Sequence, residues 1–169
     1  ASGVTSEVQL TLADFIDVDY DDPAWDELLD TISPADLIYM VRMGGYGTPS
    51  LDYILKPATV EKDGPAGISA TLVGGTQGMA YPTEVVIAST WNQALVEDFG
   101  VSVGNEGIWG NARGDGMPYS GWYAPACNIH RSPFGGRNFE YFSEDPYLAG
   151  KMAAAYIRGI QSQGVAACP

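Results

Sequence analysis

The stretch that decides the fold is residues 122–168, WYAPACNIHRSPFGGRNFEYFSEDPYLAGKMAAAYIRGIQSQGVAAC. Residues 122–129 form an apolar run that predicts a strand, in which Pro125 restricts pairing. Residues 165–168 predict the next buried strand, and a helix is predicted between the two. Strand, loop, helix and strand in this order are typical of a parallel α/β unit with a right-handed crossover. The sequence therefore predicts an α/β fold.

The predicted helix of this unit begins at residues 143–146. Ser143 can cap it, and Pro146 suits its first turn. Glu144 and Asp145 favour the positive end of the helix. Apolar residues then recur at helical spacing, at Leu148, Met152, Ala155, Tyr156, Gly159 and Ile160. Gly164 is expected to end the helix before the second strand.

Upstream, two further helices are predicted. One opens at Pro23, capped by Asp22, and contains Trp25, Leu28 and Leu29. The next opens at Ser33 with a signal similar to a capping box. Residues 46–81 are expected to be mostly loop.

Residues 85–88 are expected to form either a buried strand or the lead into the next helix. That helix has Ser89 or Thr90 as a possible cap. Its apolar stripe is predicted at Trp91, Leu95, Phe99 and Val103.

Composition excludes several classes of protein. The chain has 169 residues, 46% hydrophobic and 17% charged, which is typical of a folded domain. Its formal charge of −13 disfavours nucleic acid and anionic membranes as partners. No apolar run approaches the roughly 20 residues that span a bilayer. The first residues lack the pattern of a signal peptide, so the localisation stays open, with the cytoplasm favoured.

The chain begins with a polar and then acidic segment, residues 1–22, expected to be a solvated lead-in. The spacing of Asp17, Asp19 and Asp21 is similar to that of a calcium loop. However, Asp22 stands where such a loop needs glycine, and Leu28 stands where it needs a bidentate glutamate. The segment is therefore not expected to bind metal.

Several catalytic sites are also excluded. The sequence has no P-loop and no G-x-S-x-G elbow. His130 is the single histidine, and it is expected to be a hydrogen-bonded structural residue. Cys127 and Cys168 are expected to be small buried apolar residues. No metal or other cofactor is expected.

Carboxylates, an arginine and aromatic residues in glycine-rich loops remain, and this set suits a sugar. A carboxylate or guanidinium can hydrogen-bond two adjacent hydroxyls. Aromatic faces can stack on the apolar side of a sugar, although such residues more often belong to a core. The candidates are Tyr46, Tyr119, Trp122 and Tyr123.

Two motifs connect these residues to a known family. Residues 62–68, KDGPAGI, contain a DGP-x-G loop, and residues 128–147, NIHRSPFGGRNFEYFSEDPY, form a long and specific signature. Together they resemble glycoside hydrolase family 3, in the wording of its β-glucosidase branch. Residues 89–92 and 164–168 fit the same family in the same order. The resemblance covers residues 23–169.

The resemblance implies the first few strand–helix units of a TIM-type (β/α)₈ barrel, with the substrate site at the carboxyl ends of the strands. Asp63 would accept hydrogen bonds from outer hydroxyls of the glycone, and Arg137 would donate to a neighbouring hydroxyl. Tyr46 would line the site. The alternatives are an ordinary Asp-Gly turn at Asp63 and an ion pair of Arg137 with Glu140 or Asp145.

The family mechanism implies a retaining β-glucosidase that hydrolyses terminal non-reducing β-D-glucosyl residues. Its nucleophile and its acid have no counterpart in this chain, so no catalytic residue is assigned and the isolated chain is expected to be inactive. A complete barrel takes about 250 residues, so the domain is expected to be incomplete. The chain ends at Pro169, where the family's Lys-His pair would begin.

The expected partners are a β-glucoside or oligosaccharide substrate and a cover for the open side of the barrel. That cover would be the remainder of the parent enzyme or a second copy. The alternative function is a non-catalytic sugar-binding or structural module derived from the same barrel. Within the enzyme class, β-xylosidase and N-acetylglucosaminidase activities stay open.

Overall fold

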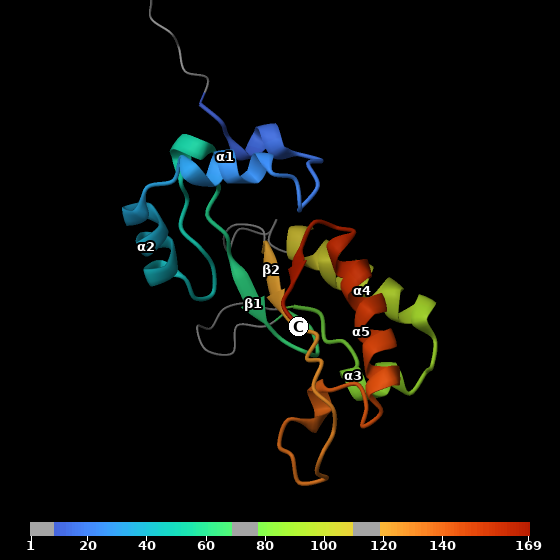
Figure 1. The fold of residues 1–169 in the computed structure, drawn as a ribbon. Coiled ribbons are helices and arrows are strands. Elements are labelled where there is room, and N and C mark those ends of the chain that lie inside the picture. Colours follow the sequence, from blue (N-terminus) through green and yellow to red (C-terminus); the bar gives the residue numbers. More distant parts are fainter. Residues whose placement is uncertain (1–8, 69–77, 110–118) are drawn as a thin grey trace, which may run out of the picture. The chain divides into compact units, whose positions relative to one another are not determined.

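The computed structural model describes residues 9–68, 78–109 and 119–169 (Figure 1). Within it the chain forms two compact units, Ala1–Thr59 and Val60–Pro169. Each unit has its own hydrophobic cluster, so each is described by itself.

The first unit is built from short helices. They are η1 (Leu12–Phe15), α1 (Ala24–Asp30), α2 (Pro34–Met43) and η2 (Asp52–Ile54). Its core consists of Phe15, Leu28, Leu51 and Ile54, with the ring of Phe15 lying 4.6 Å from that of Trp25. A residue of the acidic N-terminal segment thus belongs to this core.

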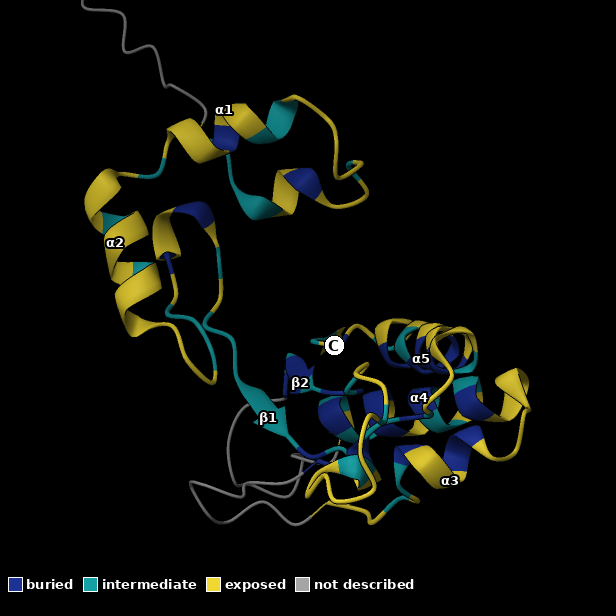
Figure 2. Cartoon of the chain, turned by 60° about the horizontal axis from the view of Figure 1, so that its bottom comes forward, coloured by how far each residue is buried: buried dark blue, intermediate teal, exposed yellow. Residues whose placement is uncertain are grey.

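Helix α2 begins where the sequence predicts, with Ser33 as its cap, whereas α1 begins one residue later than predicted, with Pro23 rather than Asp22 at its N-cap position. Asp22 Oδ1 accepts a hydrogen bond from Ala24 N at 2.8 Å, and Ser33 Oγ accepts one from Asp36 N at 3.1 Å. Both predicted helices are therefore confirmed. The side chains of α2 are largely exposed, as the colouring in Figure 2 shows, and Val41 is 84% exposed.

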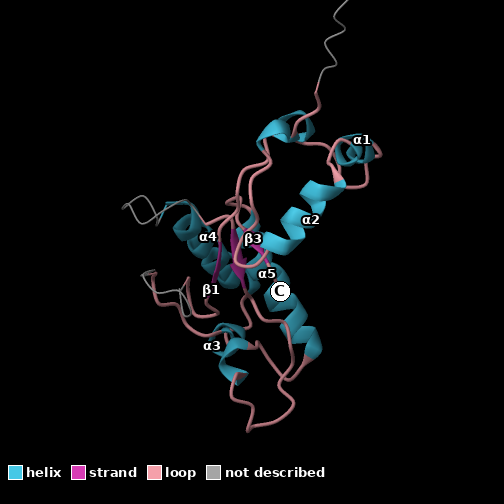
Figure 3. Ribbon diagram, turned by 90° about the vertical axis from the view of Figure 1, so that its left-hand side faces the viewer, coloured by secondary structure: helices cyan, strands magenta, loops and turns pink. Residues whose placement is uncertain are grey.

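The second unit contains a parallel sheet in the order β1 (Glu61–Asp63), β2 (Gly121–Tyr123) and β3 (Ala166–Ala167). Lys62 pairs with Trp122, which in turn pairs with Ala167. The second strand is shorter than predicted, because it ends at Tyr123 and the chain then turns through Pro125. Figure 3 shows the strands in magenta among the helices of this unit.

Two long helices, α4 (Gln93–Trp109) and α5 (Pro146–Gln161), pack on one face of this sheet (Figures 1 and 3). Trp122 is fully buried there, and its ring meets that of Tyr156 of α5 edge-on at 5.4 Å. Because side chains alternate along a strand, Glu61, Asp63 and Tyr123 belong to the opposite face. In a closed barrel, that opposite face is the interior.

Glycines set the close approach of α4 to α5. A Cβ atom on Gly100 would lie 3.0 Å from Gly159 Cα, and one on Gly104 would lie 2.8 Å from Ile160 O. Side chains at these positions would push the helices apart. At these glycines the two helices therefore meet backbone to backbone, beside the buried side chains that both contribute to the core.

The predicted stripe of α4 is only partly correct. Residues 85–88 lie in a separate short helix, α3 (Glu84–Ala88), so the open choice there resolves to helix. Trp91 precedes α4, has a positive φ of 54° and is 74% exposed. Asn92 Oδ1 accepts from Leu95 N at 3.2 Å at the start of α4. Val103 of the predicted stripe is fully buried, but Leu95 is 39% exposed and the neighbouring Val96 is buried in its place.

The predicted crossover helix is confirmed as α5, with one correction at its start. Its N-cap is Asp145, whose Oδ1 accepts from Tyr147 N at 2.7 Å. Ser143 Oγ instead accepts from Asp145 N at 3.0 Å. With Pro146 as the first helical residue, the residue directly before it takes the cap position. Of the helices in the described ranges, none has the length and apolar character needed to cross a bilayer.

Candidate functional site

Asp63 is the last residue of β1 and comes directly before a turn that Gly67 N closes by donating to Gly64 O at 3.1 Å. Its Oδ1 accepts a hydrogen bond from Gly64 N at 2.8 Å. Gly64 has a φ of 129°, a conformation that residues with side chains rarely adopt. The buried Trp122 Nε1 donates to Gly64 O at 2.8 Å and ties the turn to β2. The hydrogen bond from Gly64 N thus fixes the Asp63 carboxylate directly before this turn.

The connection after β2 is folded back by hydrogen bonds. His130 N donates to Ser143 O at 3.1 Å, and His130 Nε2 lies 2.8 Å from Asn138 O and 3.0 Å from Tyr141 O. Asn138 Nδ2 donates to Ser132 O at 2.7 Å. The structural role predicted for His130 is confirmed, because its ring holds the segment that carries Arg137.

Arg137 forms an ion pair with Glu140 of η4 (Asn138–Glu140). The arginine side chain is 70% exposed, whereas that of Glu140 is 4% exposed. Hydrogen bonding to Glu140 raises the pKa of the Arg137 guanidinium, and Asp63 adds a smaller attraction. Of the five N–H donors of a guanidinium, Nε faces Glu140. The ion pair therefore orients the Arg137 guanidinium and leaves the other end of this group exposed to solvent.

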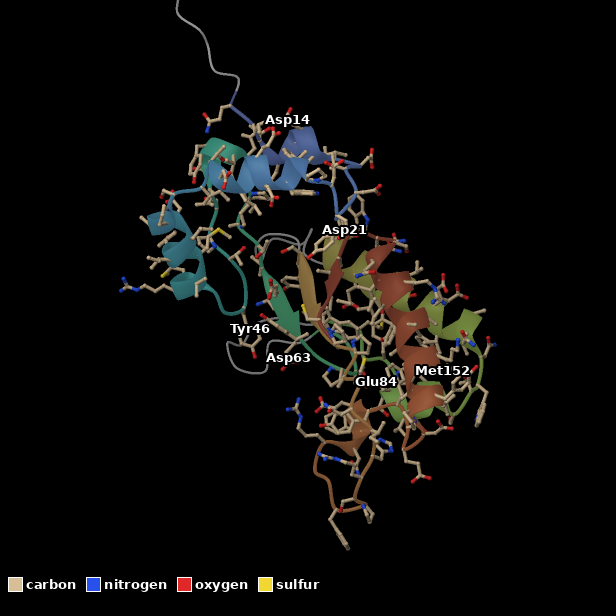
Figure 4. The ribbon with its side chains drawn as sticks, viewed as in Figure 1. Asp14, Asp21, Tyr46, Asp63, Glu84 and Met152 are labelled. Atoms are coloured by element: carbon tan, nitrogen blue, oxygen red, sulfur yellow. The ribbon has the colours of Figure 1, made fainter. Side chains whose placement is uncertain are left out.

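Asp63 and Arg137 thus belong to one end of the second unit. Asp63 lies at the end of β1 (Figure 4), and Arg137 follows β2, the neighbouring parallel strand. Tyr46 belongs to the first unit, where it is 49% exposed and lines a shallow hollow with Thr48 and Thr59. The sequence-based assignment of all three residues to a sugar site stays a prediction.

For two of the aromatic candidates the core alternative holds, whereas the expectation for the cysteines is wrong. Tyr119 and Trp122 are core residues, 6% and 0% exposed, so their faces are not available for stacking on a sugar. Cys127 is exposed and Cys168 is half-buried. The error at Cys127 follows from the strand, which ends at Tyr123 rather than reaching that residue. Within the described ranges, no group of three acidic, histidine or cysteine side chains could hold a metal ion.

Glu84, which the sequence reasoning did not single out, is the most deeply buried acid among the described residues, at 0% exposed. Burial raises its pKa to about 8, and the negative charge of Glu140 adds to the shift. The only sign of this burial in the sequence is that Glu84 comes directly before the apolar residues 85–88. Such a residue is ordinarily expected at the exposed start of a helix.

The fold and the site together define a class. Parallel strands joined by crossover helices, with an acid and an arginine after their carboxyl ends, are typical of the first units of an α/β barrel. The glycosyl hydrolase family 3 N terminal domain matches residues 50–168. The chain therefore belongs to glycoside hydrolase family 3.

The relatives agree with this assignment. The chain is 38% identical over 164 residues to beta-glucosidase A of Butyrivibrio fibrisolvens, covering 97% of this chain and 18% of that protein. It is 38% identical over 145 residues to a beta-glucosidase of Rhizobium radiobacter, covering 84% and 17% of the two chains. The chain thus spans about a fifth of the length of these relatives.

Solved structures are similar as well. Beta-glucosidase 3B from Thermotoga neapolitana in complex with glucose has a TM-score of 0.68 at 35% identity, over 84% of this chain and 22% of that one. Beta-glucosidase from Kluyveromyces marxianus has a TM-score of 0.73 at 32% identity, over 84% and 17%. The prediction of a partial α/β barrel from the β-glucosidase branch of this family is confirmed.

Proposed function

We propose that this chain forms the first strand–helix units of the catalytic barrel of a retaining β-glucosidase that hydrolyses terminal non-reducing β-D-glucosyl residues. In this proposal Asp63 and Arg137 supply part of the glycone subsite. The observation that carries it is the fixed acid and arginine at the carboxyl ends of neighbouring parallel strands. The β-glucosidase relatives and the glucose complex of the Thermotoga protein support the same substrate class.

The chemistry of the two side chains suits adjacent sugar hydroxyls. The Asp63 carboxylate accepts hydrogen bonds from hydroxyls, and the exposed end of the Arg137 guanidinium donates to them. Both are charged, and each such hydrogen bond is worth about 1.5–3 kcal/mol. A substrate that lacks the matching hydroxyl would leave a charged group unpaired, which gives the subsite its selectivity.

Hydrolysis with retention needs two carboxyl groups about 5–5.5 Å apart, one on either side of the scissile bond. Neither member of that dyad is assigned to this chain. The Asp63 carboxylate accepts one hydrogen bond from Gly64 N, and Glu140 is buried and paired with Arg137. The chain is therefore proposed to bind and orient the glycone, and we expect no hydrolysis by it in isolation.

The proposal is tested in a chimeric enzyme in which residues 50–168 replace the matching segment of the Butyrivibrio β-glucosidase A. We expect the chimera to hydrolyse p-nitrophenyl β-D-glucoside. The variants Asp63→Ala and Arg137→Ala should each lower kcat/KM by about tenfold to a hundredfold, as expected for one lost charged hydrogen bond. Arg158→Ala is the matched control, because Arg158 is also an exposed arginine paired with a glutamate.

Two results would contradict the proposal. One is a chimera whose kcat/KM is unaffected by Asp63→Ala and Arg137→Ala. The other is hydrolysis by the isolated chain that survives purification and disappears with Asp63→Ala. If the isolated chain binds glucose or cellobiose at millimolar concentration and Arg137→Ala abolishes this, the non-catalytic sugar-binding module is favoured instead.

A further inference from the structure

Glu84 is a buried carboxyl group without an evident counter-charge. It is 0% exposed, and neither of its side-chain oxygens has a hydrogen-bond partner among the described residues. An ionised carboxylate in such surroundings is strongly unfavourable, whereas the neutral acid is tolerated far better. The group therefore keeps its proton at neutral pH, in agreement with its pKa of about 8.

The titratable groups that face Glu84 come from every element packed around it, and all of them are acids. Glu140 faces it from η4, the Cys127 thiol from the connection after β2, and the Tyr156 hydroxyl from α5. Burial raises the pKa of Cys127 and of Tyr156, and the negative charge of Glu84, once it is ionised, raises both further. Among the described residues that face Glu84, none carries a positive charge, and neither Glu84 oxygen accepts a hydrogen bond from the thiol or the hydroxyl.

Glu140 differs from Glu84 in one respect, although it is also buried, at 3% exposed. Its carboxylate is paired with the Arg137 guanidinium. When two carboxyl groups share a buried site and a single cation is paired with one of them, the proton goes to the other. The geometry thus assigns the charge to Glu140 and the proton to Glu84.

We propose that Glu84 is a positioning residue for Arg137, whose neutral carboxyl group supports η4 and keeps Glu140 directed at the guanidinium. Helix α3, which carries Glu84, packs directly against η4, and Figure 4 shows Glu84 and Asp63 at the same end of the second unit. The role of Arg137 as a sugar ligand rests on the proposed function. Ionisation of Glu84 would place a second negative charge against Glu140, displace η4 and release the guanidinium.

The link between the two glutamates is tested without sugar, by ¹³C NMR of the full chain labelled at the glutamate carboxyl carbons. One signal should report a neutral acid at pH 7, titrate near pH 8 and be missing from Glu84→Gln. The Glu140 signal, identified by its loss in Glu140→Gln, should shift along the same curve. Glu97→Gln is the control, because Glu97 is exposed and pairs with Arg158. A chain without a carboxyl titrating above pH 7, or a Glu140 signal that ignores Glu84, would overturn the proposal.

The link to sugar binding is tested in the chimeric enzyme, through the inhibition constant of glucose between pH 6.5 and pH 9. With about nine-tenths of Glu84 ionised at pH 9, glucose should bind about tenfold more weakly there than at pH 6.5. Glu84→Gln should remove this loss, whereas Glu97→Gln should retain it. An identical pH dependence in Glu84→Gln and the unmodified chimera would refute the positioning role. An inactive chimera would instead count against the proposed function, and the carboxyl titration would still decide the coupling of Glu84 to Glu140.

Discussion

Replacing Glu84 by glutamine should change how the stability of the chain depends on pH. The carboxyl group of Glu84 has a pKa of about 8 in the folded chain and an ordinary value of 4.5 when exposed. The folded state therefore binds one proton more than the unfolded state between these two values. A raised pKa of this kind contributes stability that is complete below pH 4.5 and is lost as the pH rises toward 8. Glutamine has nearly the same shape and cannot ionise, so it removes this dependence.

The magnitude follows from the single proton. One proton taken up on folding changes the free energy of unfolding by about 1.4 kcal/mol for each pH unit. Over the interval from 4.5 to 8, the full effect is about 5 kcal/mol. Between pH 5 and pH 8, the wild-type chain should therefore lose roughly 3 to 4 kcal/mol relative to Glu84→Gln. A native domain is stable by only about 5–15 kcal/mol, so the difference is large enough to measure.

The assay is urea unfolding of both proteins at pH 5, 6, 7 and 8, followed by tryptophan fluorescence. Taking the difference between the two proteins cancels the contributions of all other titrating groups. Glu97→Gln is the control and should run parallel to the wild type, because Glu97 is exposed. Equal pH slopes in the wild type and Glu84→Gln would show that Glu84 is ionised in the folded chain, and the reasoning from its burial would then be refuted.

Three further substitutions test the packing. Trp122→Phe removes the donor to Gly64 O and should lower the free energy of unfolding in urea by about 1–3 kcal/mol; an unchanged value would mean that the turn does not depend on it. Asp145→Ala should cost about 0.5–2 kcal/mol in the same assay, with Asp145→Asn retaining most of the stability. Gly159→Ala places a methyl group 2.9 Å from Gly100 Cα and should lower the thermal midpoint, although alanine is the better helix former by about 1 kcal/mol. A higher midpoint would show that the helices can separate.

Some parts of the fold could be predicted because their signals are local. The start of α2 at Ser33 and the periodic stripe of α5 depend on spacing and caps within a few residues. The segment carrying Arg137 could be found because its signature is long and specific, and the short DGP-x-G loop that carries Asp63 was recognised together with it. In each case, the information lies in a short run of sequence.

Other parts could not be predicted, because they depend on contacts between distant residues. Ala124 is buried although it follows the end of β2, so an apolar run alone does not show where a strand stops. The face of α4 that packs against α5 contains glycines. Because glycine has no apolar side chain, the hydrophobic pattern of the sequence did not show which face of α4 is buried. Glu84 is an acidic residue, which the sequence alone would place at the surface, but it is fully buried in the fold. Its burial depends on η4 and α5, which are distant in the sequence.

The glycine contact between α4 and α5 also bears on how the second unit opens. Gly100, Gly104 and Gly107 each cost a helix about 1 kcal/mol relative to alanine, so α4 has little tendency to persist alone. We therefore expect α4 to be helical mainly when it is docked against α5. The docking is possible because Gly100 and Gly104 have no side chains that would collide with the backbone of the neighbouring helix. The two helices should therefore behave as a single cooperative unit in native-state hydrogen exchange, with their core amides exchanging at one common free energy.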